Sequence, residues 1–221
     1  MKNYKIIQNK QSLKDFINWL PELKDNEKFY LSLFARRKYD PTNVIKSDKS
    51  QVKRFVTTKE RMFDKIKQLE VEIGCYKLND QEVPQEALAL YINPNPRDMK
   101  KATFQMIKKS VEMIEKDYSF NIHAEALSCI QRSKGSTYFL DFDIDDREID
   151  LNKLYNKIDP KYLEIVDTRG GIHILVKVRE IPKSIKFHKI IRDLYNVDQI
   201  GDQLLPVPGC VQGGFIPKFI K

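Results

Sequence analysis

The sequence predicts an α+β protein, in which short strands and amphipathic helices follow one another along all 221 residues. The clearest strand covers 136–144 and includes most of the acidic stretch YFLDFDIDD (138–146). From there the chain reads strand, helix, strand, strand, helix, strand. Apolar residues make up 41% of the chain, which is enough for a proper core. We therefore expect one body with an N-terminal α/β lobe (1–132) and a C-terminal lobe (133–221).

The N-terminal lobe is predicted from apolar periodicity and from the residues that stop each element. A first helix carries an apolar stripe at Leu13, Phe16, Ile17 and Leu20 and ends at Pro21. The other expected elements are a strand at 29–34, a long basic helix at 50–73, a strand at 86–92, and helices at 99–118 and about 122–131. Between the second strand and the third helix, the letters NPNPRD predict a rigid turn.

The C-terminal lobe continues from the acidic strand with short elements. They are a helix near 151–158, a strand at 162–167, a return strand at 172–179, a helix from 184 and an extended stretch at 197–207. Gly170 and Gly171 are expected to supply the positive φ of the hairpin turn, and Ser184 to cap the last helix. The order β-α-β-β-α-β is that of the ferredoxin-like, split βαβ arrangement.

In that arrangement the acidic strand is central, and its carboxylates lie on the face that the helices leave open. Asp141, Asp143 and His173 then share this face, and Asp198 begins the neighbouring fourth strand. We expect the strands of Asp143 and His173 to run parallel. A long stagger or a bulge is then needed to bring the two side chains together.

The overall charge indicates a polyanion partner. Lys and Arg number 39 and Asp and Glu 31, which gives a net charge of +8 and a pI near 9.2. Such a balance is typical of nucleic-acid binding.

The three cysteines are far apart and form no CxxC, so we expect neither a disulfide framework nor a zinc site. Without a signal sequence or an apolar run of about 18 residues, we expect a soluble, cytoplasmic protein with no membrane partner.

The acidic strand is the main candidate site. Asp141 and Asp143 on one strand face, with Asp198 from a neighbour, repel one another unless a cation lies between them, and such oxygen-rich sites suit Mg²⁺ or Mn²⁺. His173 suits contact with a triphosphate oxygen. The other interpretation of this strand is a charged, solvated sheet edge.

Two basic segments of the N-terminal lobe are candidate DNA contacts. Arg36, Arg37 and Lys38 precede Tyr39, a pattern that suits phosphate binding and base stacking, or alternatively a solvated strand exit. Arg97 leaves the rigid turn beside the start of a helix.

Three motifs in order resemble those of the archaeo-eukaryotic primase (AEP) superfamily of primase-polymerases. Leu140-Asp141-Phe142-Asp143 resembles its hhhDhD motif, Gly171-Ile172-His173 its small-x-His motif, and Val197-Asp198, or less neatly Gly201-Asp202, its later hD motif. The segment 205–210 resembles the loop that often follows, although its Arg is missing and Cys210 replaces Thr. The turn NPNPR resembles an NPR turn of primase-polymerases from phages and mobile elements.

The resemblance implies an AEP-like catalytic core whose C-terminal unit is ferredoxin- or RRM-like. It also implies an activity: the core makes or extends primers on single-stranded DNA from NTPs or dNTPs, with Mg²⁺ or Mn²⁺. Metal ligands then map onto Asp141, Asp143 and Asp198, with Asp202 as the alternative, and nucleotide contacts onto His173, with Arg169, Lys134 and Ser136 as further candidates. No P-loop and no zinc-binding cysteines are present, so we expect a bare core that depends on a separate helicase or initiator, in the host cytoplasm if phage-encoded.

Two other functions use the same residues. A metal-dependent nuclease or replication initiator would employ the same carboxylates, although the His-hydrophobe-His pair of a nicking relaxase is absent at His173. A non-catalytic module for single-stranded nucleic acid would instead place aromatic residues at Asp141, Asp143 and His173.

Overall fold

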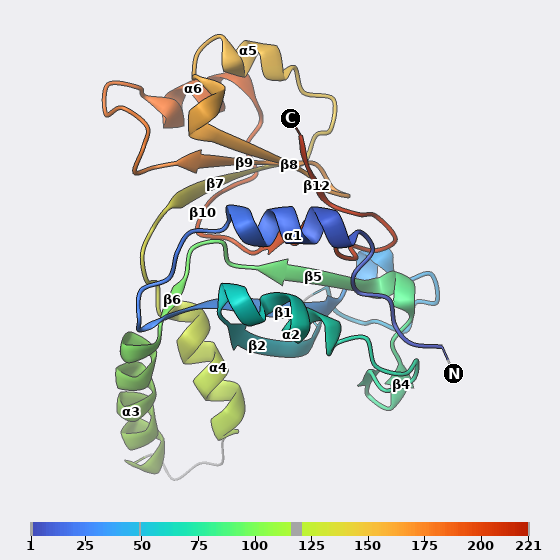
Figure 1. Ribbon diagram of the computed structural model, residues 1–221. Helices are drawn as coiled ribbons and strands as arrows, with labels where there is room; N and C mark the ends of the chain where they lie inside the picture. Colours follow the sequence, from blue (N-terminus) through green and yellow to red (C-terminus); the bar gives the residue numbers. More distant parts are fainter. Residues whose placement is uncertain (1, 49, 116–120, 221) are drawn as a thin grey trace.

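A computed structural model describes residues 2–48, 50–115 and 121–220, and shows an α+β protein built on two antiparallel sheets (Figure 1). The first sheet comes mainly from the first half of the chain. In spatial order, its strands are β11 (Leu205–Pro206), β5 (Leu88–Ile92), β1 (Glu27–Ala35) and β2 (Ser50–Thr57), and β6 (Arg97–Asp98) pairs with β1. The short strands β3 (Lys77–Leu78) and β4 (Gln81–Glu82) form a separate hairpin.

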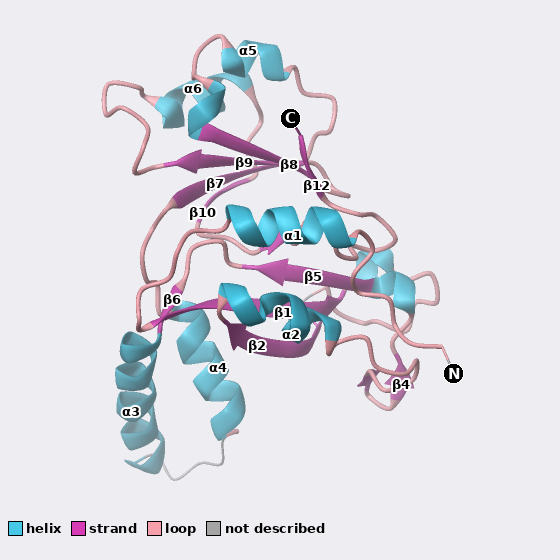
Figure 2. Ribbon diagram, viewed as in Figure 1, coloured by secondary structure: helices cyan, strands magenta, loops and turns pink. Residues whose placement is uncertain are grey.

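The second sheet belongs to the C-terminal half, and its elements follow in the order strand, helix, strand, strand, helix, strand. They are β7 (Phe139–Ile144), α5 (Leu151–Tyr155), β8 (Leu163–Asp167), β9 (Ile172–Lys177), α6 (Phe187–Leu194) and β10 (Gln199–Gly201). In space the strands lie in the order β10-β7-β9-β8, and β12 (Lys218–Ile220) extends the sheet beyond β8. Figure 2 shows α5 and α6 on one side of this sheet. The acidic strand β7 therefore lies inside the sheet, between two paired neighbours.

The direction of β9 corrects one expectation. β7 and β9 run antiparallel, not parallel, and Asp143 lies directly opposite His173 in their register. Antiparallel pairing brings the end of one strand beside the start of the other. The carboxylate and the imidazole therefore meet without the stagger or bulge that a parallel pair would need.

The two faces of the second sheet belong to different cores. Phe142, Ile144 and Ile174 pack with α5 and α6 on one face. On the other face, Phe139 and Leu175 join the larger core that contains the first sheet and α1 (Lys10–Trp19). The face predicted to be open is thus partly covered by the N-terminal half, because its apolar positions are buried between the two sheets.

Residues 50–73 do not form one helix. Residues 50–57 form β2, which pairs with β1, and the helix α2 runs only over Lys59–Lys67 with Met62 and Ile66 buried. Val52, Val56 and Thr57 favour extended structure, and pairing with the central strand β1 outweighs the helical spacing of the apolar residues.

The remaining helices agree with the periodicity. α1 begins after Asn9, whose side chain accepts a hydrogen bond from the Ser12 N–H, and ends just before Pro21. α3 (Met99–Glu115) and α4 (Ile122–Arg132) form a pair at one end of the first sheet, while positions 116–118 of the predicted helix lie outside the described residues. None of the described helices is long and apolar enough to cross a membrane.

Two local expectations in the C-terminal half are wrong. Neither Gly170 nor Gly171 has a positive φ. Gly171 is required for a different reason: a Cβ there would lie 2.0 Å from the carbonyl oxygen of Ile144. The last helix starts later than expected, with Lys186 rather than Ser184 at its N-cap.

Candidate functional site

A cleft of about 930 Å³ lies where the two sheets face each other. Side chains from both halves of the chain line it, including Tyr91 and Arg97 from the first sheet and Asp143 and His173 from the second. Carboxylates, an imidazole and several cations line this cleft together. This combination makes it the candidate site.

His173 lies between two carboxylates. Its Nδ1 is 2.9 and 3.0 Å from the two oxygens of Asp141, and its Nε2 is 3.4 Å from Oδ1 of Asp143. The Asp141 side chain is only 2% exposed and that of Asp143 23%. Asp141 therefore orients the imidazole from inside the protein, while Asp143 lies on the cleft side.

The neighbouring carboxylates influence the protonation of His173 and of Asp143. Burial disfavours a charged imidazole, but the carboxylates of Asp141, Asp143 and Asp145 outweigh it and raise the pKa of His173. Burial also raises the pKa of Asp143; attraction to His173 opposes this, whereas repulsion from Asp141, Asp145 and Asp198 adds to it. Three carboxylates around one imidazole leave an excess of negative charge, which a bound cation would relieve.

The predicted metal triad is not assembled as expected. Among residues 2–48, 50–115 and 121–220, no group of three or more His, Cys, Asp or Glu side chains is arranged to hold a metal ion. Asp141 is enclosed with His173, whose Nδ1 lies 2.9 and 3.0 Å from its two carboxylate oxygens. Asp198 is exposed and contributes its backbone N–H to the Asp143 carbonyl, 2.9 Å away.

The carboxylates that do line the cleft near His173 are Asp143 and Asp145. Sequence analysis omitted Asp145, yet it continues the alternation of Asp141 and Asp143 by one more step beyond the end of β7. A protein site for Mg²⁺ often supplies only one or two carboxylates, with water and substrate phosphate as the other ligands. Asp143 and Asp145 are thus the two carboxylates near His173 that reach the cleft, whereas Asp141 is enclosed behind the imidazole.

Asp202, the alternative ligand, is bound within the protein. Its Oδ2 is 2.5 Å from Nη1 of Arg97, and its Oδ1 accepts a hydrogen bond of 3.2 Å from Nδ2 of Asn95. Arg97 is 2% exposed, so it is not the surface DNA contact that the sequence predicted. The ion pair instead forms part of the cleft wall.

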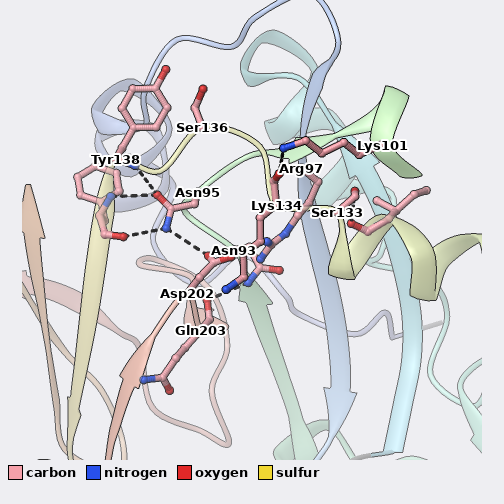
Figure 3. A network of polar contacts seen from close by, with 12 residues as sticks. Asn93, Asn95, Arg97, Lys101, Ser133, Lys134, Ser136, Tyr138, Asp202 and Gln203 are labelled. Carbon is pink, nitrogen blue, oxygen red and sulfur yellow. Dashed lines mark hydrogen bonds and ion pairs between the residues drawn. The ribbon is translucent and has the colours of Figure 1, made fainter. Parts of the chain in front are cut away.

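Asn95 is the centre of this polar network (Figure 3). Its Oδ1 accepts hydrogen bonds from the backbone N–H groups of Tyr138 and Phe139, at 2.7 and 2.9 Å, and its Nδ2 donates to the Phe139 carbonyl at 2.8 Å. The turn that was predicted to be rigid therefore fastens the start of β7 to the first sheet. Because Asn95 also contacts Asp202, it connects both halves of the cleft.

Cations line the cleft together with these carboxylates. They are Arg36, Lys38, Arg97, Arg132 and Lys134. Nη1 of Arg36 donates to the Tyr91 hydroxyl at 2.9 Å, and its Nε lies 3.8 Å from Asp48. Arg132, at the end of α4, is a cleft residue that sequence analysis missed, because a charge at a helix end carries no signal of its own. Arg37 is exposed and lies outside the cleft lining.

Two further candidates lie apart from the cleft lining. Arg169 is placed over the Tyr39 ring, 4.3 Å from its centroid, and Nη1 donates to the Gly213 carbonyl. Ser136 is buried, and its backbone N–H donates to Oε1 of Glu27 at 2.6 Å. Of the predicted nucleotide contacts, the structure brings His173 and Lys134 to the cleft.

No protein-family model matches the chain, and comparisons with curated proteins and with solved structures find no match. The chemistry of the cleft and the motifs of the sequence are therefore the basis for a functional proposal.

Proposed function

We propose that this protein is a metal-dependent nucleotidyltransferase of the primase-polymerase type, which makes or extends a strand on a single-stranded DNA template. The observation that carries the proposal is the cleft itself. It holds the carboxylates Asp143 and Asp145, the imidazole of His173 and a set of Arg and Lys side chains. Carboxylates suit a divalent metal and the cations suit phosphates, so one cleft has donors for both parts of a metal-nucleotide substrate.

The arrangement of the second sheet supports the proposal. A ferredoxin-like βαββαβ unit has its first strand between its third and fourth, and here β7 lies between β9 and β10. The first two AEP-like motifs then fall on the adjacent strands β7 and β9, with Asp143 directly opposite His173. This juxtaposition supports the resemblance seen in the sequence.

The residues of the cleft have separate roles in this proposal. Asp143 and Asp145 would hold Mg²⁺ or Mn²⁺, which lowers the pKa of an attacking 3′-hydroxyl and neutralises the leaving pyrophosphate when bound. His173, held by Asp141, donates a hydrogen bond from Nε2 to a phosphate oxygen. Lys134, Arg132 and Lys38 bind the phosphates of the nucleotide and of the DNA.

A strand-synthesis assay tests the proposal. The purified protein is mixed with Mn²⁺, a single-stranded template with or without a primer, and labelled NTPs or dNTPs. We expect labelled products, and we expect Asp143→Asn and Asp145→Asn each to reduce their formation by about 100-fold or more. Asp146→Asn is the matched control, because Asp146 is the adjacent carboxylate, is exposed and lies outside the cleft lining.

The same assay separates the alternatives. Shortening of the DNA that depends on Asp143 would favour a nuclease, and DNA binding without any product would favour a binding module. Synthesis that persists in both Asp→Asn variants would refute the metal assignment.

A further inference from the structure

The α3–α4 pair presents an unusual amount of apolar surface. Within α3 and α4 only Ala102, Met113 and Cys129 are buried. Large apolar side chains of the pair are instead 52–76% exposed; they are Phe104, Ile107, Val111, Ile114 and Ile122. The pair lies at the end of the first sheet that is remote from α5 and α6 (Figure 1). Apolar residues gathered in one patch of this kind mark an interaction surface.

The exposed residues of α3 have the spacing of a helix–helix seam. Phe104, Ile107, Val111 and Ile114 follow one another at intervals of three, four and three residues. These are the intervals of the a and d positions of a heptad, which form a narrow stripe suited to packing against another helix. The stripe therefore fits a helical partner better than a flat or extended one.

The shape of the surface is complementary to itself. Ile107, Val111 and Ile114 line one side of a groove of about 390 Å³ between α3 and α4. Phe104 is 65% exposed and lies outside the groove lining, so it projects as a knob. When two α3 helices pack antiparallel, Phe104 of one copy lies opposite Ile114 of the other. Each knob then meets the groove of the second copy.

The charges beside the stripe favour the same orientation. Lys101 and Glu115 lie on one edge of it, about four helical turns apart. Antiparallel packing places Lys101 of one copy beside Glu115 of the other, twice by symmetry. Nζ of Lys101 also donates to the Lys134 carbonyl at 3.0 Å. Lys108 lies nearer the middle of α3, and its Nζ is 3.9 Å from Oε1 of Glu112 in the same helix.

We propose that a second copy of this chain docks on the α3–α4 pair about a two-fold axis, with the two α3 helices antiparallel. Such an interface is isologous, so every contact occurs twice and the assembly closes as a dimer. This proposal rests on the helix pair alone and is independent of the chemistry of the cleft.

Sedimentation velocity over a range of protein concentrations tests the proposal. We expect the wild-type protein to be in monomer–dimer equilibrium, and Val111→Glu to raise the dimer Kd by about 100-fold or more, since it buries a charge in the seam. Val111 is 52% exposed, so its substitution leaves the core unchanged. Ile216→Glu is the matched control, because Ile216 is 40% exposed and lies outside the helix pair.

A charge exchange tests the orientation. Lys101→Glu is expected to weaken the dimer by about tenfold, and Lys101→Glu combined with Glu115→Lys to restore it. A wild-type protein that stays monomeric at all concentrations would overturn the proposal and indicate a different partner for the stripe. Dimerisation that Val111→Glu leaves unchanged would overturn it too, as would a failure of the double exchange to restore the dimer.

Discussion

Asn95→Asp replaces one nitrogen by oxygen at the centre of the polar network. Oδ1 would still accept hydrogen bonds from the Tyr138 and Phe139 N–H groups. The second oxygen, however, would take the place of Nδ2, which donates to the Phe139 carbonyl at 2.8 Å and to Oδ1 of Asp202 at 3.2 Å. Two hydrogen bonds would thus become two repulsive oxygen–oxygen contacts at a residue that is 4% exposed.

The expected cost follows from these contacts. Each lost hydrogen bond costs about 1 kcal/mol, and a buried carbonyl left without a donor costs about 1–3 kcal/mol more. We therefore expect Asn95→Asp to lower the free energy of unfolding by about 3–5 kcal/mol at neutral pH. The pKa of the introduced carboxyl should be raised by burial and by Asp202, so its protonated form, which is again a donor, would reduce the loss at acidic pH.

Urea unfolding monitored by tryptophan fluorescence measures this effect directly. Trp19 is the only tryptophan of the chain, and its ring lies 4.6 Å from that of Phe139, a hydrogen-bond partner of Asn95. Asn9→Asp is the matched control, because the Asn9 side chain only accepts a hydrogen bond, at the start of α1, where a negative charge is favourable. The reasoning is refuted if the two variants are equally stable at neutral pH, or if the loss in Asn95→Asp is the same at pH 4 and pH 7.

Two other predictions concern the junction of the two sheets. Glu27 is 3% exposed, and burial disfavours its charged form. Hydrogen bonds from Ser136 and from the Lys24 N–H outweigh the effect of burial and lower the pKa of Glu27. Its carboxylate therefore stabilises the fold above the ordinary pKa, and this contribution is lost as the pH falls through the lowered value. Glu27→Gln should cost about 1–3 kcal/mol at neutral pH and flatten the acid side of a stability–pH curve; an unchanged acid limb would contradict this. Gly171→Ala should destabilise the protein by about 3 kcal/mol or more in urea unfolding, since a Cβ would lie 2.0 Å from the Ile144 carbonyl oxygen, whereas Gly170→Ala, with its nearest contact at 3.6 Å, should be tolerated. Equal stability of these two variants would show that β7 and its neighbouring turn are not packed as described.

Local patterns predicted most of the secondary structure. The alternation at 139–144 and at 172–177 depends only on residues two apart, so both strands were predicted within a few residues of their ends. The segment 50–57 was assigned wrongly, because its apolar residues fit both periods. Pairing with the strand β1, whose residues lie 15 to 28 positions earlier in the chain than their partners, decides in favour of the extended form.

The candidate site was predicted in part. Asp143, His173 and Lys134 were selected from motifs or position and do line the cleft. The motif selected Asp141 and Asp143 and left out Asp145, although all three aspartates occupy alternating positions. What distinguishes them is the covering of the sheet face: Asp141 is enclosed with His173, and Asp145 is exposed at the end of β7.

Short-range periodicity and residue type were thus enough to predict the α+β class, the order of the C-terminal elements and the acidic strand with its nearby histidine. The antiparallel register that places Asp143 opposite His173, and the enclosure of Asp141, became visible only in the folded chain. The same is true of the pairing of Arg97 with Asp202, which lies 105 residues away. Such features depend on which distant segments pack together, and that choice follows from the burial of both sheet faces rather than from any local pattern.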